Sequence, residues 1–224
     1  QGGPLSPLLS NIVLDELDQE LEKRGHKFAR YADDCNIYVR SERAGQRVMR
    51  SLRRLIANKL RLRINENKSA VARPHERQFL GFSFTSKGEP RCRIAPKALV
   101  RFKNRIREIT RRKRGRRLDH VVQELNLYLT GWRGYFDFSG TRSDLERLDP
   151  WIRRRLRAYI WKQWKTFKKR CTELRQRHVN PAEAKTLAAS PKGPWRLSHT
   201  KALQKALPNR FFDSLGLTRL WQPA

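Results

Sequence analysis

The sequence predicts an α+β fold, in which a small antiparallel sheet with its helices precedes a mainly helical bundle. Through residue 95, runs of aromatic and β-branched residues with strand character alternate with amphipathic helical stretches. From Pro96 onward, apolar residues recur at helical spacing, and short connections between such stretches are typical of a helix bundle. We therefore expect three regions, covering residues 1–95, 96–178 and 179–224.

The net charge indicates an anionic partner. The chain has 224 residues, with 51 Lys and Arg against 21 Asp and Glu, and a formal net charge of +30. So many positive charges repel one another unless an anionic partner offsets them, and nucleic acid is the expected partner. Ribosomal-type proteins and proteins that bind anionic membranes have similar compositions. Residues 96–224 hold 32 basic and 10 acidic groups, against 19 and 11 in residues 1–95. The aromatic residues supply bulk for a core and argue against a disordered basic tail.

Cysteine usage and hydropathy exclude several classes of protein. The three cysteines, Cys35, Cys92 and Cys171, lie far apart and form no Cys-x-x-Cys pair. We therefore expect neither a disulfide framework nor a zinc knuckle, and we expect a reducing compartment. No run approaches the ~20 apolar residues of a membrane span. A membrane-surface role is not favoured, because the basic residues are spread over many elements. The chain begins with Gln1, without methionine, so nothing about targeting follows.

The most informative stretch is residues 27–39. Two strand-like runs flank Ala32-Asp33-Asp34, which predicts a hairpin with two adjacent carboxylates at its tip, although this is not an Asn-Gly type of turn. Neighbouring carboxylates repel unless water, a base or a cation offsets them. Mg²⁺ suits such a pair, because it takes carboxylate oxygens and keeps positions open for substrate phosphates. The alternative interpretation is an ordinary Asx-rich turn.

The first helix is expected after a turn-rich opening. Residues 1–7 contain glycines that allow a backbone to approach a ligand closely, although an ordinary loop is the alternative. Ser6 suits an N-cap and Pro7 a first helical residue. Gly25 ends the pattern. The apolar residues that recur every four positions in this helix are Leu9, Val13, Leu17 and Leu21.

A second amphipathic helix is predicted over residues 42–60. Its apolar face has Val48, Leu52, Leu55 and Ile56. The other face is either solvated or in contact with a nucleic-acid backbone, and has Arg43, Arg47, Arg50, Arg53 and Arg54.

Three short strands are predicted after this helix, over residues 62–65, 79–84 and 92–94. A turn over 65–68 follows the first, and a turn over 86–89 joins the other two. Gly81 within a strand suggests a bulge or a close backbone approach.

Three helices are predicted in the bundle, over residues 96–112, 118–129 and 143–176, with an aromatic and glycine interruption at 131–136 and a short helix at 200–207. Basic groups interleaved with aromatics can hold phosphates while rings stack on unpaired bases. The alternative is that the tryptophans are core and the lysines solvated. The residues expected to contact RNA are Arg111, Arg112, Lys113, Arg114, Arg116, Arg117, Arg153, Arg154, Arg155, Lys165, Lys168, Lys169 and Arg170.

The order of motifs carries a family resemblance. Gln-Gly-x-Pro-Leu-Ser-Pro from residue 1, Tyr-Ala-Asp-Asp over 31–34, Asn-x-x-Lys over 65–68 and Phe-Leu-Gly-Phe over 79–82 resemble the later palm blocks of reverse transcriptases. The continuation, with Gly-Trp-x-x-Tyr-Phe over 131–136, is similar to the maturase-specific (thumb) domain of bacterial group II intron proteins. Residues 1–95 would then be a partial palm, 96–178 the thumb, and 179–224 a C-terminal extension of the maturase region.

The resemblance implies an RNA-directed DNA polymerase and splicing maturase in the bacterial cytoplasm. Its partners would be group II intron RNA and, in the full-length protein, a DNA primer or target and dNTPs. Asp33 and Asp34 would bind two Mg²⁺ ions, with Asp33 the stronger candidate. The residues with further implied roles are Gln1 and Gly2 near template and nucleotide, Tyr31 near primer and metals, Lys68 at the nucleotide phosphates, and Leu80 and Gly81 at the primer.

The chain departs from the family in one respect. The family's first catalytic aspartate and the fingers lie upstream of Gln1, so we expect no polymerisation by these 224 residues alone. No paired Cys/His cluster follows the bundle, so the endonuclease of some relatives is not expected. The alternative function is a non-enzymatic RNA-binding splicing cofactor, or the remnant of a degraded intron reading frame.

Overall fold

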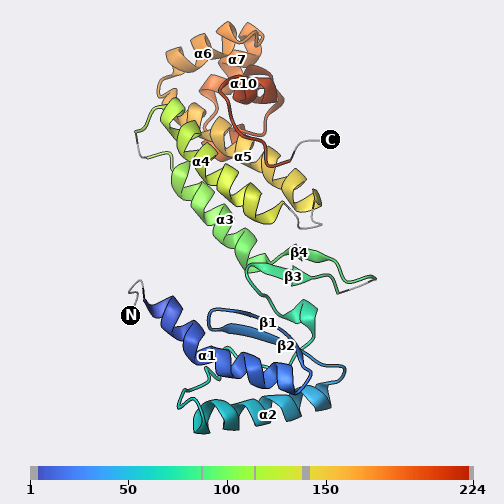
Figure 1. Cartoon of the computed structure of the whole chain (residues 1–224). Coiled ribbons are helices and arrows are strands. Elements are labelled where there is room, and N and C mark those ends of the chain that lie inside the picture. The colour runs from blue at the N-terminus through green and yellow to red at the C-terminus, as the bar shows by residue number, and fades with distance from the viewer. Residues whose placement is uncertain (1–4, 87, 114, 138–141, 222–224) are drawn as a thin grey trace. The chain divides into compact units, whose positions relative to one another are not determined.

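The computed structural model describes residues 5–86, 88–113, 115–137 and 142–221. They form two compact units, residues 1–88 and 89–224 (Figure 1). The functional boundaries expected at residues 95 and 178 stay predictions. Within the described residues, no helix has the length and apolar character needed to cross a membrane.

The first unit is built from two helices and a hairpin. Helix α1 (Ser6–Lys23) precedes strands β1 (Lys27–Tyr31) and β2 (Asp34–Tyr38), and helix α2 (Glu42–Asn58) follows them. A short 3₁₀ turn, η1 (Pro74–Glu76), comes later. The hairpin and the α2 helix are confirmed as predicted, and Ser41 caps α2 by accepting a hydrogen bond from the Ala44 amide.

The core of this unit lies where α1, α2 and one face of the hairpin meet. Its buried residues are Leu17, Leu21 and Leu52, surrounded by Leu14, Phe28, Cys35, Ile37, Val48, Leu55, Ile56 and Leu60. In the antiparallel register, Phe28 pairs with Ile37 and Arg30 with Cys35. Because side chains alternate along a strand, these four share the core face, and Tyr31 and Asp34 share the opposite face.

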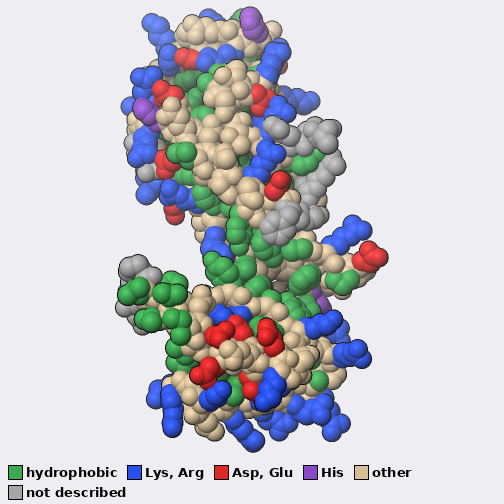
Figure 2. Space-filling model, viewed as in Figure 1, with side chains coloured by type: hydrophobic (Ala, Val, Ile, Leu, Met, Phe, Trp, Pro, Cys, Tyr) green, Lys and Arg blue, Asp and Glu red, His purple; other side chains and the backbone are tan. Residues whose placement is uncertain are grey.

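The start of α1 differs from the prediction. Its N-cap is Leu5, without a side-chain cap, and Ser6 already lies inside the helix. Leu9 and Val13 are 57% and 41% exposed, because only the C-terminal half of the helix reaches the core. Figure 2 shows hydrophobic side chains gathered at the surface over the beginning of α1.

Two of the three later strands differ from the prediction. Residues 62–65 form no strand, because the Leu62 amide donates to the Ile56 carbonyl and the chain folds back on the end of α2 without a strand partner. Leu80 and Gly81 have φ of 51° and 80° and form a tight turn, so neither lies in a strand or a bulge. The Phe79 and Phe82 amides and carbonyls exchange two 2.9 Å hydrogen bonds across this turn. Strand β3 is Phe82–Phe84 and pairs with β4 (Cys92–Ile94), as expected for the hairpin at 86–89.

The second unit is helical. Its long helices are α3 (Pro96–Ile109), α4 (Leu118–Phe136) and α5 (Arg142–Gln163). The shorter helices are α6 (Phe167–Gln176), α7 (Pro181–Ala189), α8 (Pro194–Leu197), α9 (Lys201–Ala206) and α10 (Asn209–Ser214). The core includes Phe102, Ile106, Leu125, Leu129, Leu156 and Trp161. The short helix expected at 200–207 is confirmed as α9, capped by Thr200.

Two helix boundaries in this unit were predicted wrongly. The segment 131–136 continues α4 instead of interrupting it, since Trp132 packs against Phe102 at a ring distance of 4.3 Å and against Phe136 at 4.7 Å. The long helix expected over 143–176 breaks between α5 and α6, where the Thr166 hydroxyl accepts a hydrogen bond from the Lys169 amide and starts a new helix.

Candidate active site and nucleic-acid interface

The two predicted acids lie at the tip of the β1–β2 hairpin. Tyr31 and Asp34 form its last pair, so Ala32 and Asp33 make a two-residue turn. Ala32 has φ of 52°, which is uncommon for a residue other than glycine and costs on the order of 1 kcal/mol. Such a conformation persists where the surrounding contacts hold it in place.

Arg30 supplies these contacts. Its Nη1 donates to the Ala32 carbonyl and to Asn11 Oδ1, both at 2.9 Å. Its Nε and Nη2 donate to the Asp18 carboxylate, at 2.8 and 2.5 Å. The hydrogen bonds that Arg30 donates to Asp18 raise the pKa of the guanidinium, and the Arg30 side chain is only 12% exposed. The turn is therefore tied to α1 through one side chain.

Arg30 was not predicted from the sequence as a site residue. The alternation of β1 contained the signal, because it places Arg30 on the same face as Phe28, toward the core. A guanidinium on a core face requires polar partners, and α1, which precedes the hairpin in the chain, contains several acids.

Asp33 and Asp34 are themselves exposed and free. Within the described residues, neither carboxylate forms a hydrogen bond or an ion pair. Tyr31 is 65% exposed and shares with Asp34 the face of the hairpin that is turned away from the core. Two adjacent acids without a protein partner are available to a cation.

The donor set fits part of a metal site. Mg²⁺ prefers octahedral oxygen ligands and often keeps positions for water and substrate phosphates, which two exposed carboxylates allow. Across the described ranges, no group of three or more His, Cys, Asp or Glu side chains is arranged to hold a metal. The turn therefore suits a cation that takes further ligands from elsewhere, and not a closed protein cage.

The other predicted residues of the first unit lie in the segment after α2. The expected turn at 65–68 is present, with the Lys68 amide donating to the Asn65 carbonyl at 3.1 Å and the Lys68 side chain exposed. The Arg77 guanidinium donates to the Lys68 carbonyl, and the Ser83 hydroxyl donates to the Arg77 carbonyl, so this turn is connected to β3. Gln1 and Gly2 lie outside the described residues.

Several of the predicted RNA contacts in the second unit have structural partners. Arg153 is buried and pairs with Asp149 and Asp213, at 3.5 and 3.0 Å, so its guanidinium is used inside the bundle. Arg154 lies over the Trp195 ring at 4.0 Å. Arg170 lies over a core tryptophan, Trp161, at 4.8 Å and donates to the Trp164 carbonyl.

The basic run before α4 is divided between paired and free residues. Arg111, Arg112 and Lys113 are exposed, and Arg114 lies outside the described residues. Arg116 pairs with Glu124 at 2.7 Å, and Arg117 pairs with Asp119 at 3.2 Å.

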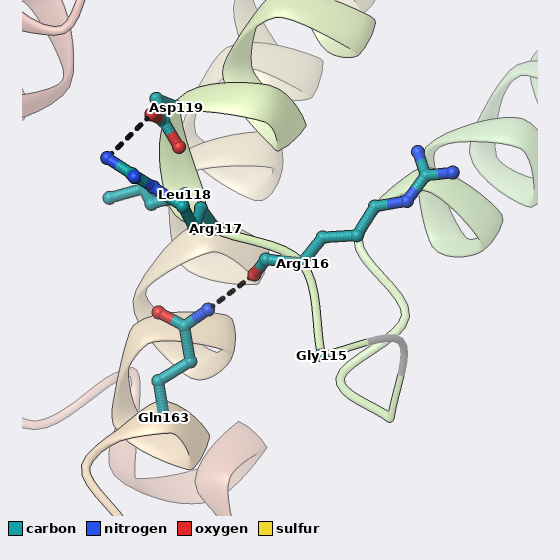
Figure 3. A pocket seen from close by; sticks show the side chains of 6 residues that line it. All are labelled: Gly115, Arg116, Arg117, Leu118, Asp119 and Gln163. Carbon is teal, nitrogen blue, oxygen red and sulfur yellow. Dashed lines mark hydrogen bonds and ion pairs between the residues drawn. The ribbon is translucent and has the colours of Figure 1, made fainter.

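Arg116 and Arg117 border a surface hollow of about 430 Å³ at the start of α4. In Figure 3 their side chains extend in opposite directions, and Gln163 donates to the Arg116 carbonyl at 2.8 Å. Of the predicted lysines, Lys165, Lys168 and Lys169 are all exposed, and Lys169 pairs with Glu173 at 2.7 Å.

One cluster of like charges has no acid to offset it. Arg107 and Arg155 both lie over the Trp151 ring, at 5.8 and 5.6 Å, and the Arg155 Nε donates to Thr110 Oγ1 at 2.7 Å. Burial, and then the charges of Arg112 and Arg107, lower the pKa of Arg155 to about 10. Within the described part of the chain, none of the three arginines of this cluster, Arg107, Arg112 and Arg155, forms an ion pair. A bound anion would relieve this repulsion.

An exposed acid pair on a hairpin, followed on the same chain by an arginine-rich helical unit, is typical of proteins that act on nucleic acids. Residues 1–84 match the family model "Reverse transcriptase (RNA-dependent DNA polymerase)", and residues 99–178 match "Group II intron, maturase-specific domain". The chain belongs to the group II intron reverse transcriptase/maturase family. Both domains imply nucleic-acid partners, intron RNA among them. No curated protein matches the chain.

Proposed function

We propose that this chain serves RNA-directed DNA synthesis and intron splicing, with Asp33 and Asp34 as metal ligands. The exposed, unpaired acid pair, on a turn that Arg30 holds against α1, carries this proposal. Bound Mg²⁺ would supply activation of a primer 3′-hydroxyl and stabilisation of the leaving pyrophosphate. The chain's own contribution is to hold the backbone of the turn that carries the two acids, with Asp33 in the turn and Asp34 at the first position of β2.

Neighbouring residues would orient the substrates. Tyr31 faces the same side of the hairpin as Asp34, where an exposed ring can support the primer. Lys68 offers an exposed ammonium for nucleotide phosphates. The tight turn at Leu80 and Gly81 allows a backbone to approach the primer closely. For Gln1 and Gly2 the proposal rests on family resemblance alone.

We assign RNA binding in the second unit to Arg107 and Arg155 on Trp151, with the nearby charge of Arg112. The exposed residues Arg111, Lys113, Lys165 and Lys168 would add further contacts. Guanidiniums stacked on a ring can hold a phosphate while the ring offers a face to a base. Burial and then the charges of Arg112 and Arg107 lower the pKa of Arg155, and the part due to those charges supports this assignment, since an anionic ligand would offset it.

The experiment for DNA synthesis is primer extension. In the described residues no third carboxylate joins Asp33 and Asp34, so we expect no extension by these 224 residues alone, with either Mg²⁺ or Mn²⁺. Metal-dependent extension by the purified chain would contradict this expectation. The same assay on a longer protein that contains this segment should show activity that Asp33→Ala abolishes.

The incomplete ligand set also favours a second function, namely an RNA-binding splicing cofactor without polymerase activity. Intron splicing separates the two. If the roles are separable, Asp33→Ala leaves protein-assisted splicing largely intact while it abolishes DNA synthesis. Loss of both activities would show that the substitution had damaged the fold or a shared surface.

A further inference from the structure

We infer that α2 carries a second RNA-binding surface, an arginine strip that holds the phosphate backbone of structured RNA. The arginine strip consists of Arg43, Arg47, Arg50 and Arg54. It lies on the first unit, whereas the RNA contacts assigned above lie on the second. The inference rests on the proposed function in taking RNA as the partner, and it adds a site that neither family match assigns.

Helix geometry places the four arginines on one face. Their spacing of four, three and four residues keeps them within a sector of about 60°, along about 16 Å of helix axis. Leu52, with Val48, Leu55 and Ile56, lies on the opposite face and packs into the core of the unit. The core therefore fixes the rotation of α2 and directs the arginine strip outward.

Several other cations of this unit have acidic partners. Arg24 pairs with Glu20 at 2.7 Å, and Lys59 pairs with Glu16 at 3.0 Å. Arg53, on a neighbouring face of α2, pairs with Glu66 at 2.5 Å. Within the described ranges, no residue of the arginine strip forms an ion pair. Like charges three and four residues apart weaken a helix, so the fold itself does not account for the arrangement.

The arginine strip also borders a hollow suited to an anion. Arg47, Arg50 and Arg54 line a surface hollow of about 510 Å³, and its other lining residues are Arg24, Ser51, Leu55, Asn58 and Lys59. The Arg24 Nη1 donates to Ser51 Oγ at 2.7 Å, which fixes one wall. Figure 2 shows Lys and Arg side chains gathered along the side of the unit where Figure 1 places α2. Several guanidiniums can thus reach one phosphate, which their planar forks bind in two-contact geometry.

The chemistry of α2 favours RNA over a membrane. A helix that binds a lipid surface inserts its apolar face, but here that face is buried in the core of the unit. A row of exposed arginines on the opposite face of the helix can instead follow a line of phosphates. Binding through such contacts is strongly salt-dependent.

The test compares two triple variants of the 224-residue chain. The first is Arg47→Gln, Arg50→Gln and Arg54→Gln, in the arginine strip. The matched control is Lys23→Gln, Arg40→Gln and Arg63→Gln, which removes the same charge from exposed residues of the same unit. Binding to a structured group II intron RNA is measured over a range of salt concentrations. We expect the strip variant to lose affinity on the order of tenfold and its salt slope to fall by about 3, while the control stays within about twofold.

The inference is overturned if the strip variant binds as the control does, or if both lose affinity equally. It is also overturned if the strip variant loses binding to phosphatidylserine vesicles but not to RNA. Arginine modification of the unaltered chain by phenylglyoxal tests it without a variant, since RNA should protect Arg47, Arg50 and Arg54 but not Arg40. Absence of that protection contradicts the inference.

A further variant separates this inference from the proposed function. Arg107→Gln with Arg155→Gln removes the cluster on Trp151. If only this variant weakens RNA binding, the assignment in the second unit stands and the arginine strip fails. If the unaltered chain binds structured RNA no better than it binds a polyanion such as heparin, both fail.

Discussion

Arg30 and Asp18 form a two-contact ion pair, with Nε–Oδ1 and Nη2–Oδ2 distances of 2.8 and 2.5 Å. The same guanidinium donates to the Ala32 carbonyl, so α1 and the acidic turn are joined through one side chain. The backbone before Asp33 is therefore held by a residue three positions earlier in the sequence. Charge-assisted bonds of this kind are the strong ones in proteins, and their geometry is specific to arginine.

The first prediction concerns this ion pair. Arg30→Lys cannot reproduce the two-contact geometry or reach Ala32 at the same time, so the hairpin should open more often, with a loss of about 2 kcal/mol in its local stability. Hydrogen exchange of the β1–β2 amides, read by mass spectrometry, measures this. Asp18→Asn should have a similar effect, and the double variant should be less than additive because the two residues share one interaction. Strictly additive effects would show that the pair is not coupled.

The second prediction concerns cation binding at the turn. Added Mn²⁺ should broaden the amide resonances of residues 31–36, since the two carboxylates are exposed and unpaired. Asp33→Asn should remove most of this broadening. Glu22→Gln, which changes another exposed acid of the same unit, is the control and should leave it unchanged. Broadening that persists in a variant lacking both Asp33 and Asp34 would place the cation elsewhere.

The third prediction concerns Arg107 in the cluster on Trp151. Arg107→Gln should weaken binding of structured RNA about fivefold, equivalent to about 1 kcal/mol for one charge-assisted contact, and lower the salt slope by about 1. Arg105→Gln is the matched control, because Arg105 lies on the same helix but is already paired with Glu108 and Glu124. A control variant that loses as much affinity as Arg107→Gln would indicate a general charge effect and not a site.

The sequence pattern predicted those elements whose stability is local. The β1–β2 hairpin and α2 follow from alternation and from helical spacing, because each buries one face within a single unit. The prediction of a strand at 62–65 was wrong, since a strand needs a partner and the pattern does not say whether one is present. The glycines at 131 and 134 indicated a break, but the packing of Trp132 and Phe136 on Phe102 and on one another keeps α4 helical.

The candidate site could be predicted only in part, for a similar reason. Asp33 and Asp34 are adjacent in sequence, so their pairing was visible without coordinates. The side-chain partners of Arg30 are 12 and 19 positions away, and Arg107 and Arg155 meet across 48 residues, so only the folded chain brings them together. Which arginines are exposed is likewise a property of packing, and Arg153 is buried where its neighbour Arg154 is not.

The last prediction uses the thiol of Cys35, which lies beside the Arg30–Asp18 pair on the core face of the hairpin. Burial, followed by the charge of Asp18, raises the pKa of this thiol to about 11, against a smaller opposing effect of Arg30. The folded chain therefore keeps the proton where the unfolded chain releases it. This contribution to stability is fully present below about pH 9 and is lost as the pH rises to about 11.

Alkylation by iodoacetamide at pH 8 should consequently be much slower at Cys35 in the folded chain than after unfolding in urea, because the thiolate is the reactive form. The free energy of unfolding should fall between pH 9 and 11. In the Cys35→Ala variant this fall should be smaller, because the contribution of the thiol is gone. Peptide mass spectrometry resolves the modification of Cys35 from that of Cys92, whose pKa burial also raises and which serves as an internal comparison. Rapid labelling of Cys35 in the folded chain would show that the hairpin opens freely, and would contradict the rigid attachment of the acidic turn to α1.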